Sequence, residues 1–129
     1  MAKLLRQLWP NRPMNLDASE VVFNRALASD QQELICAVKD DVLIGFGTLT
    51  FKNNLWVEGC LAHVDELVVE GTSSGQGVGT RLLEELIMTA RQRGCRRVEL
   101  DSAHHRQQAH QFYEKQGFEN RALLFSRPL

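Results

Sequence analysis

The segment of residues 64–83 reads Val64-Asp-Glu-Leu-Val-Val-Glu-Gly-Thr-Ser-Ser-Gly-Gln-Gly-Val-Gly-Thr-Arg-Leu-Leu83. Its apolar run from Leu67 to Val69 is typical of a buried strand, and the glycines after it suit a backbone that bends or approaches a ligand closely. Apolar residues then recur at a helical period, as Leu82, Leu83, Leu86, Ile87 and Ala90. A glycine turn that enters a helix presents unpaired N–H groups and the positive end of the helix dipole. The segment therefore predicts a site for phosphate or pyrophosphate.

The length and composition of the chain place this segment in one globular domain that spans residues 1–129. The net charge of −1 gives no overall field for binding nucleic acid or an anionic membrane, and neither is expected as a partner. No apolar run approaches the roughly 20 residues that a membrane helix needs. The cysteines Cys36, Cys60 and Cys95 form no C-x-x-C pair, so we expect a reduced, cytoplasmic protein in which each is a small buried hydrophobe.

Hydrophobic periodicity and turn residues predict a mixed α/β sandwich of order α-α-β-β-β-α-β-α-β. The expected elements are helices at 3–8 and from a cap at Asn15 or Asp17 through Leu27, strands at 34–38, 42–51 and 55–69, a helix at 78–93, a strand at 97–101, a helix at 107–116 and a last strand at 118–126. Because the strand at 97–101 follows a helix, we expect it to pair in parallel with the strand that ends at Val69.

The third predicted strand contains one irregularity. Strict alternation fails at Asp65-Glu66, where two charged residues fall side by side between apolar ones. A β-bulge there would restore the inward register and splay this strand from its neighbour. The alternative is an ordinary strand end that reaches solvent, but the apolar run that follows favours the bulge.

Two motifs of the chain resemble those of a known protein family. The turn Ser74-Gly75-Gln76-Gly77-Val78-Gly79 and the helix Ala109-His-Gln-Phe-Tyr-Glu-Lys-Gln-Gly-Phe118 resemble, in this order, signatures of the GNAT superfamily of N-acetyltransferases. Within it, Glu66-Leu-Val-Val69 is similar to aminoalkylphosphonate-type enzymes. The resemblance spans about residues 34–125 and implies a centrally splayed sheet flanked by helices, the acyl-CoA N-acyltransferase fold. Other phosphate loops fit less well, because no lysine follows a glycine and the spacing G-x-G-x-G is not a dinucleotide fingerprint.

The resemblance also implies the cofactor contacts. Acetyl-CoA is expected to bind, largely through backbone N–H groups, at Leu67, Val68, Val69, Ser74, Gly75, Gln76, Gly77, Val78, Gly79 and Thr80. Ser74 departs from the family pattern, which has Arg or Gln there, so one pyrophosphate contact is either lost or supplied by Gln76 or Arg81. The family's usual first strand is also missing before the first helix. The unpaired edge that this leaves would be explained by a homodimer or by a longer native beginning.

Acetyl transfer to an amine needs a base and an acid. A lysine-like amine with a pKa near 10.4 is only about 0.04% neutral at pH 7, a cost of roughly 4.6 kcal/mol. His63, with its ordinary pKa near 6.5, and Glu66, acting through water, are the candidate bases, and the absence of a dedicated base is the third option. The resemblance implies that Tyr113 protonates the leaving thiolate; otherwise Tyr113 is a core aromatic residue. Spacing of His104, His105 and His110 matches no metal motif, so no metal is expected.

We therefore expect an N-acetyltransferase that moves an acetyl group from acetyl-CoA directly to the primary amine of a small molecule. The alternatives are an acetyltransferase that modifies protein lysines or N-termini, and a non-catalytic module that binds acyl-CoA. The resemblance implies that a backbone N–H on the strand around Leu67–Val69 stabilises the developing oxyanion where the bulge opens the sheet.

Overall fold

The computed structural model describes residues 2–73 and 75–129, and it confirms the expected mixed α/β fold. Its elements are α1 (Ala2–Leu8), α2 (Leu16–Ala28), β1 (Gln32–Lys39), β2 (Val42–Asn54), β3 (Gly59–Val69), a short 3-10 turn (Gly71–Ser73), α3 (Val78–Gln92), β4 (Arg97–Leu100) and α4 (Gln107–Lys115). Two helices precede the first strand, as the sequence predicts. No helix within the described residues is both long and apolar enough to cross a membrane.

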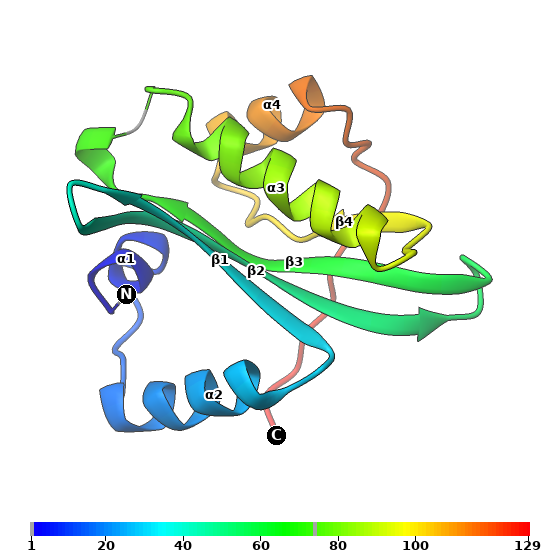
Figure 1. Ribbon diagram of the computed structural model, residues 1–129, viewed down its shortest axis with the longest axis horizontal. Coiled ribbons are helices and arrows are strands. Elements are labelled where there is room, and N and C mark those ends of the chain that lie inside the picture. Colours follow the sequence, from blue (N-terminus) through cyan, green and yellow to red (C-terminus); the bar gives the residue numbers. More distant parts are fainter. Residues whose placement is uncertain (1, 74) are drawn as a thin grey trace.

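The four strands form one mixed sheet in the order β1-β2-β3-β4. β1, β2 and β3 pair antiparallel, whereas β3 and β4 pair in parallel, which confirms the arrangement expected from the helix between them. Figure 1 shows α3 and α4 on one face of the sheet and α1 and α2 on the other. The sheet is therefore covered from both sides.

Local sequence signals set several of these boundaries. The Asn15 side chain caps α2 by accepting the N–H of Ala18 at 3.0 Å, which selects Asn15 over Asp17 as the cap. The hairpin turn between β1 and β2 uses positive φ angles at Asp40 and Asp41. After α3, Gly94 adopts a φ of +79°, the left-handed conformation that ends many helices.

The main core lies between the sheet and α3. Leu49, Phe51 and Val64 from the sheet pack there against Leu86 and other apolar residues of α3. A smaller cluster of Leu4, Phe46 and Val68 packs α1 onto the opposite face. From Gly45 to Phe51, the alternation of strand side chains thus directs odd-numbered residues of β2 toward α3 and even-numbered ones toward α1 and α2.

Two glycines of β2 allow α3 to approach the sheet. A Cβ atom at Gly47 would lie 2.6 Å from Leu86 Cδ1, and one at Gly45 would lie 3.0 Å from Leu82 Cδ1, both on α3. The expectation that these glycines leave room for a neighbour is therefore confirmed.

Three expectations were wrong. Residues 118–126 form no strand, and residues 119–129 are exposed, because an apolar run only favours pairing and no described strand pairs with it. The strand expected to begin at Leu55 begins at Gly59, after a turn in which Glu58 has a φ of +58°. Cys36 is exposed; Cys60 and Cys95 are half-buried, with their Sγ atoms 2.7 Å apart.

Candidate active site

A β-bulge in β3 lies at the centre of the site. Thr48 of β2 pairs with Glu66, whereas the next residue, Leu49, pairs with Val64, so that Asp65 is the extra residue on β3. The bulge predicted from the adjacent charges at Asp65 and Glu66 is confirmed. It turns the Glu66 side chain to the face that carries α1 and α2.

The sheet opens immediately after the bulge. β4 pairs with β3 only from Leu61 to Val64, so nothing in the described ladder pairs with the rest of β3 on that side. The Glu70 N–H donates to the Ile44 carbonyl at 2.6 Å, toward β2. Because backbone groups alternate along an antiparallel strand, those of Val68 also face β2, and those of Leu67 and Val69 face the open edge.

One of these outward groups is bound by α1. The side-chain amide of Gln7 donates to the Val69 carbonyl, and its oxygen accepts the Gly71 N–H at 3.0 Å. Gln7 therefore ties α1 to the end of β3 and to the turn that leads to the glycine loop. Sequence reasoning missed this residue, because nothing near position 7 indicates a partner more than sixty positions away.

His63 lies between two carboxylates. Its Nδ1 is 2.9 Å from Asp65 Oδ1, and its Nε2 is 3.2 Å from Asp101 Oδ2. The hydrogen bond to Asp65 is the main cause that raises the pKa of His63 above 6.5; the charges of both carboxylates add to it, and partial burial opposes it. The ring is held as a bridge across the junction of β3 and β4, with neither nitrogen free for a substrate.

Glu66 is the half-buried carboxylate on the other side of the bulge. Its Oε2 accepts the Thr48 hydroxyl, and its backbone N–H donates to the same hydroxyl oxygen at 3.0 Å. Burial raises the pKa of Glu66 above its ordinary 4.5, although the hydrogen bond from Thr48 opposes this shift. A carboxylate with a raised pKa is better matched to proton transfer near neutral pH.

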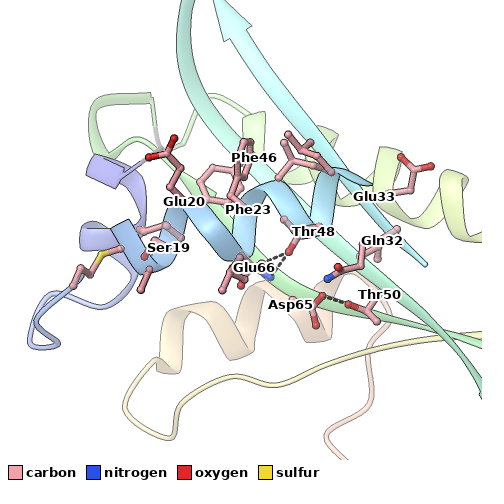
Figure 2. Close-up of a pocket in the computed structure, with 18 of the residues that line it drawn as sticks. Ser19, Glu20, Phe23, Gln32, Glu33, Phe46, Thr48, Thr50, Asp65 and Glu66 are labelled. Carbon is pink, nitrogen blue, oxygen red and sulfur yellow. Dashed lines mark hydrogen bonds between the residues drawn. The ribbon is translucent and has the colours of Figure 1, made fainter. Parts of the chain in front are cut away.

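Glu66 forms part of the floor of a cavity of about 940 Å³. The floor is made by Thr48, Thr50, Asp65 and Glu66, and the walls come from α1, α2, β1 and β2. Figure 2 shows α2 lying across this floor, with the Thr48–Glu66 and Thr50–Asp65 hydrogen bonds beneath it. The cavity is large enough for a small organic molecule.

The glycine turn fits an anionic group. Gly75 and Gly77 have φ angles of +82° and +80°, are exposed, and have no atom within 4 Å of a Cβ position. Conformation, not crowding, therefore requires glycine at both positions. The first hydrogen bond of α3 runs from the Arg81 N–H to the Gly77 carbonyl at 3.0 Å, so the N–H groups of residues 78–80 precede it. Ser74 lies outside the described residues.

Tyr113 is buried on α4. Its ring makes edge contacts with Phe112 and Phe118, with centroids 5.4 and 5.9 Å away. Burial raises the pKa of Tyr113, and the nearby guanidinium of Arg106 opposes this. A Cβ atom placed on Gly79 would lie 3.9 Å from Phe112 and 3.7 Å from Val69. The start of α3 therefore meets both the helix that carries Tyr113 and the end of β3.

The structure brings together part of the predicted site and adds residues to it. His63 and Glu66 flank the bulge, but only Glu66 lines the cavity, and Val68 is buried against α1 instead of facing the open edge. Asp101 and Thr48 were missed. The position of Asp101 after a parallel strand was the available signal for it. Within the described residues, no group of three metal-ligating side chains occurs.

Comparison with known proteins adds relatives by sequence. The chain is 30% identical over 122 residues to glucosamine 6-phosphate N-acetyltransferase 1 of Oryza sativa subsp. japonica, which covers 89% of this chain and 70% of the relative. It is 29% identical over 93 residues to the aminoalkylphosphonate N-acetyltransferase of Salmonella typhimurium, which covers 72% of this chain and 60% of the relative.

Solved structures share the fold. A putative acetyltransferase from Agrobacterium tumefaciens superimposes with a TM-score of 0.85 at 25% identity, over 98% of this chain and 90% of that one. An aminoglycoside N-acetyltransferase in complex with CoA superimposes with a TM-score of 0.84 at 24% identity, over 98% of this chain and 84% of that one. The model of the acetyltransferase (GNAT) family matches residues 1–118. This match covers the splayed sheet, the glycine turn and the helix of Tyr113, and the chain therefore belongs to the GNAT family, as an acetyl-CoA-dependent N-acetyltransferase.

Proposed function

We propose that the protein transfers an acetyl group from acetyl-CoA directly to the primary amine of a small molecule bound in the cavity above Glu66. The bulge is the observation that carries this proposal. It puts a half-buried carboxylate at the floor of a cavity on one side of β3 and leaves the edge of the same strand open. The curated relatives act, by their names, on small amines, which supports the same class of acceptor.

Acetyl-CoA supplies the acetyl group as a thioester. In the proposal, the pyrophosphate lies against the N–H groups from Gly75 to Thr80, at the positive end of the α3 dipole. The outward N–H groups of Leu67 and Val69 face the open edge of β3 and are available to the acyl part. Val68 contributes through packing alone, because its backbone groups face β2.

Glu66 is the group proposed to take the proton from the acceptor amine, directly or through water. Its carboxylate lines the cavity, and its raised pKa reduces the difference between the pKa of Glu66 and that of the acceptor amine. His63 is proposed as a positioning residue, because both of its ring nitrogens contact carboxylates. By holding Asp65, it fixes the bulge that aims Glu66 into the cavity.

Tyr113 is proposed to protonate the leaving thiolate. A phenol whose pKa is raised by burial stays protonated at neutral pH, so the proton is available when the thiolate forms. A thiol pKa of about 8.5 and a phenol pKa of about 10 or higher make this transfer feasible at modest cost. The contact of the neighbouring Phe112 with Gly79 supports a place for α4 beside the cofactor turn.

Replacing Tyr113 with Phe tests the proposal. We expect a fall in kcat of about 100-fold or more, because only the hydroxyl is removed and general-acid catalysis is typically worth that factor. Release of free thiol measures the turnover, and calorimetry with acetyl-CoA measures binding, which should be unchanged. An unchanged kcat would remove Tyr113 from the mechanism. Binding without acetylation of any amine or peptide by the unaltered protein would instead favour the non-catalytic module.

A further inference from the structure

We infer that the acceptor is an alkylamine or arylalkylamine that binds as a cation and carries no phosphate or phosphonate. This inference rests on the proposed function, because it concerns the molecule that the cavity above Glu66 would hold. Three features of the cavity carry it, namely the sign of its charges, the state of its one helix N-terminus and the apolar nature of its walls.

All the ionisable side chains that line the cavity are acidic. They are Glu20 on α2, Glu33 on β1, and Asp65 and Glu66 at the bulge. No Lys, Arg or His occurs among the lining residues, all of which belong to the part of the chain that the structure describes. Glu20 and Glu33 are exposed, and Figure 2 shows them on opposite sides of the floor. Glu33 pairs with Leu49, whose side chain packs against α3, so the Glu33 carboxylate points away from the cavity. Asp65 is paired with His63. A phosphorylated amine would therefore meet repulsion mainly from Glu20 and Glu66, and no cationic side chain lines the cavity to offset it.

The start of α2 also lines the cavity, and a helix N-terminus is otherwise suited to an anion. Here one of the N–H groups that precede the first helical hydrogen bond is already bound. The Ala18 N–H donates to the side-chain Oδ1 of Asn15 at 3.0 Å, and the first helical bond then runs from the Ser19 N–H to the Asn15 carbonyl, also at 3.0 Å. Asp17 adds a negative charge to the first turn. The helix start is therefore capped by the chain itself and is a poor place for phosphate.

The walls of the cavity are apolar and only partly covered. Trp9, Leu16, Val22 and Leu27 line it, with 41%, 46%, 62% and 59% of their surfaces exposed. The buried ring of Phe46 closes the inner end. An apolar arm on the acceptor would remove this surface from water, whereas the hydroxyl groups of a sugar would lose their hydrogen bonds against it. The ammonium group then lies toward Glu66, the half-buried carboxylate of the floor.

These features separate the chain from its curated relatives, whose names specify glucosamine 6-phosphate and aminoalkylphosphonates as substrates.

The first test compares acceptors on the unaltered protein with saturating acetyl-CoA. The probes are 2-phenylethylamine, glucosamine 6-phosphate and 2-aminoethylphosphonate, and free-thiol release gives kcat/KM for each. We expect 2-phenylethylamine to exceed both anionic amines by at least 10-fold. A preference for either anionic amine would overturn the inference and leave the proposed function standing.

The second test changes the charge of the cavity. Glu20→Lys should lower kcat/KM for 2-phenylethylamine several-fold and raise it for glucosamine 6-phosphate. The matched control is Glu84→Lys, the same charge change at an exposed residue of α3 on the opposite face of the sheet. If Glu20→Lys and Glu84→Lys have equal effects on both acceptors, the cavity does not select by charge and the inference fails.

The third test addresses the apolar wall. Val22→Ser should raise KM for 2-phenylethylamine several-fold with little change in kcat, because Val22 lines the cavity. Val21→Ser is the control, because Val21 is its exposed neighbour on α2 and does not line the cavity. Equal KM values for the two variants would contradict the inference. If the protein binds acetyl-CoA but acetylates none of the amines, the proposed function fails together with the inference.

Discussion

At the scale of single residues, the state of His63 depends on two carboxylates. Because Asp65 and Asp101 raise its pKa above 6.5, we expect its NMR titration midpoint to lie above that value. Replacing Asp101 with Asn removes one charge and should move the midpoint down. The raised pKa also means that the ion pairs stabilise the fold fully below pH 6.5, and that this contribution is lost as the pH rises through the folded pKa.

The control for this titration is Glu84→Gln, an exposed change on α3 that should leave the midpoint of His63 where it is in the parent. If the midpoint of His63 does not move in Asp101→Asn either, Asp101 does not hold the ring in solution. The contact at 3.2 Å would then have no energetic weight.

Glu66 gives a second prediction at this scale. Its carboxylate must be ionised to accept a proton, so kcat should fall as the pH falls through its raised pKa, which lies above 4.5. Glu66→Gln should abolish this acidic limb and lower kcat by about 100-fold or more, the usual value of a general base. The pH–rate profile of Glu84→Gln, an exposed change on α3, is the control. An acidic limb that survives in Glu66→Gln would assign the base to another group.

At the scale of secondary-structure elements, the contact between α3 and β2 depends on glycine. A methyl group at Gly47 would lie 2.6 Å from Leu86 Cδ1, and Leu86 has 0% of its surface exposed, so it has no space to move into. We expect Gly47→Ala to lower the free energy of unfolding by about 1–3 kcal/mol, as overpacked cores do. Denaturant unfolding measures this value.

A double-mutant cycle shows whether contact with Leu86 causes the loss of stability in Gly47→Ala. Leu86→Ala alone should cost about 2–5 kcal/mol, but the double variant should cost less than the sum of the two, because the shortened side chain leaves room for the new methyl group. Gly71→Ala is the control, since its Cβ atom would meet nothing closer than 3.7 Å. Additive costs at Gly47 and Leu86 would mean that the strain arises elsewhere.

The elements themselves were largely predictable from the sequence, and the reason is local. The period of α3, the cap at Asn15 and the glycines at 75, 77 and 94 each act within a few residues of their own position. Even the bulge was predictable, because two adjacent charges broke a period of two. The segment 118–126 shows the limit. Its apolar pattern favours a strand, but a strand needs a partner, and sequence periodicity does not report one.

The site was predictable only in part, because its remaining contacts join distant segments. Residues Glu66 and His63 were found from their strand, but the pairing of His63 with Asp101 requires β4 to end beside the bulge. The walls that α2 contributes likewise follow from its packing across the sheet. The bulge brings the side chains of His63 and Glu66 to the same face of β3, and only the structure shows that Glu66 alone of the two lines the cavity.

At the scale of the whole molecule, the exposed tail after α4 contributes little to the fold. Arg121 joins the tail to the rest of the fold. Its Nη1 lies 3.1 Å from Glu99 Oε2, and its Cζ lies 4.2 Å from the centre of the Trp56 ring. Deleting residues 122–129 removes only exposed side chains, so we expect the free energy of unfolding to change by less than about 0.5 kcal/mol. Denaturant unfolding measures the change, with a deletion of residues 120–129, which includes Arg121, for comparison.

The homodimer predicted from the unpaired edge of the sheet stays a prediction, and the same deletion tests whether the tail takes part in a dimer. Leu123, Leu124 and Phe125 are exposed by 68%, 67% and 88%. If a second copy covers them, light scattering should report a smaller mass for the shortened protein and a lower stability at high concentration. A large loss of stability in dilute protein would instead show that the tail packs on its own chain.

The two hydrogen bonds of Gln7 have a thermodynamic consequence. Helix α1 supplies Leu5 to the wall of the acceptor cavity, and Trp9, which directly follows the helix, lines it too. Through Gln7, α1 also holds the Val69 and Gly71 backbone ahead of the cofactor turn. One short helix is therefore shared by both ligands. If an acceptor orders α1, the affinity for acetyl-CoA rises, and by linkage the affinity for the acceptor rises by the same factor when acetyl-CoA binds first. The two substrates would bind cooperatively although they never share a contact residue.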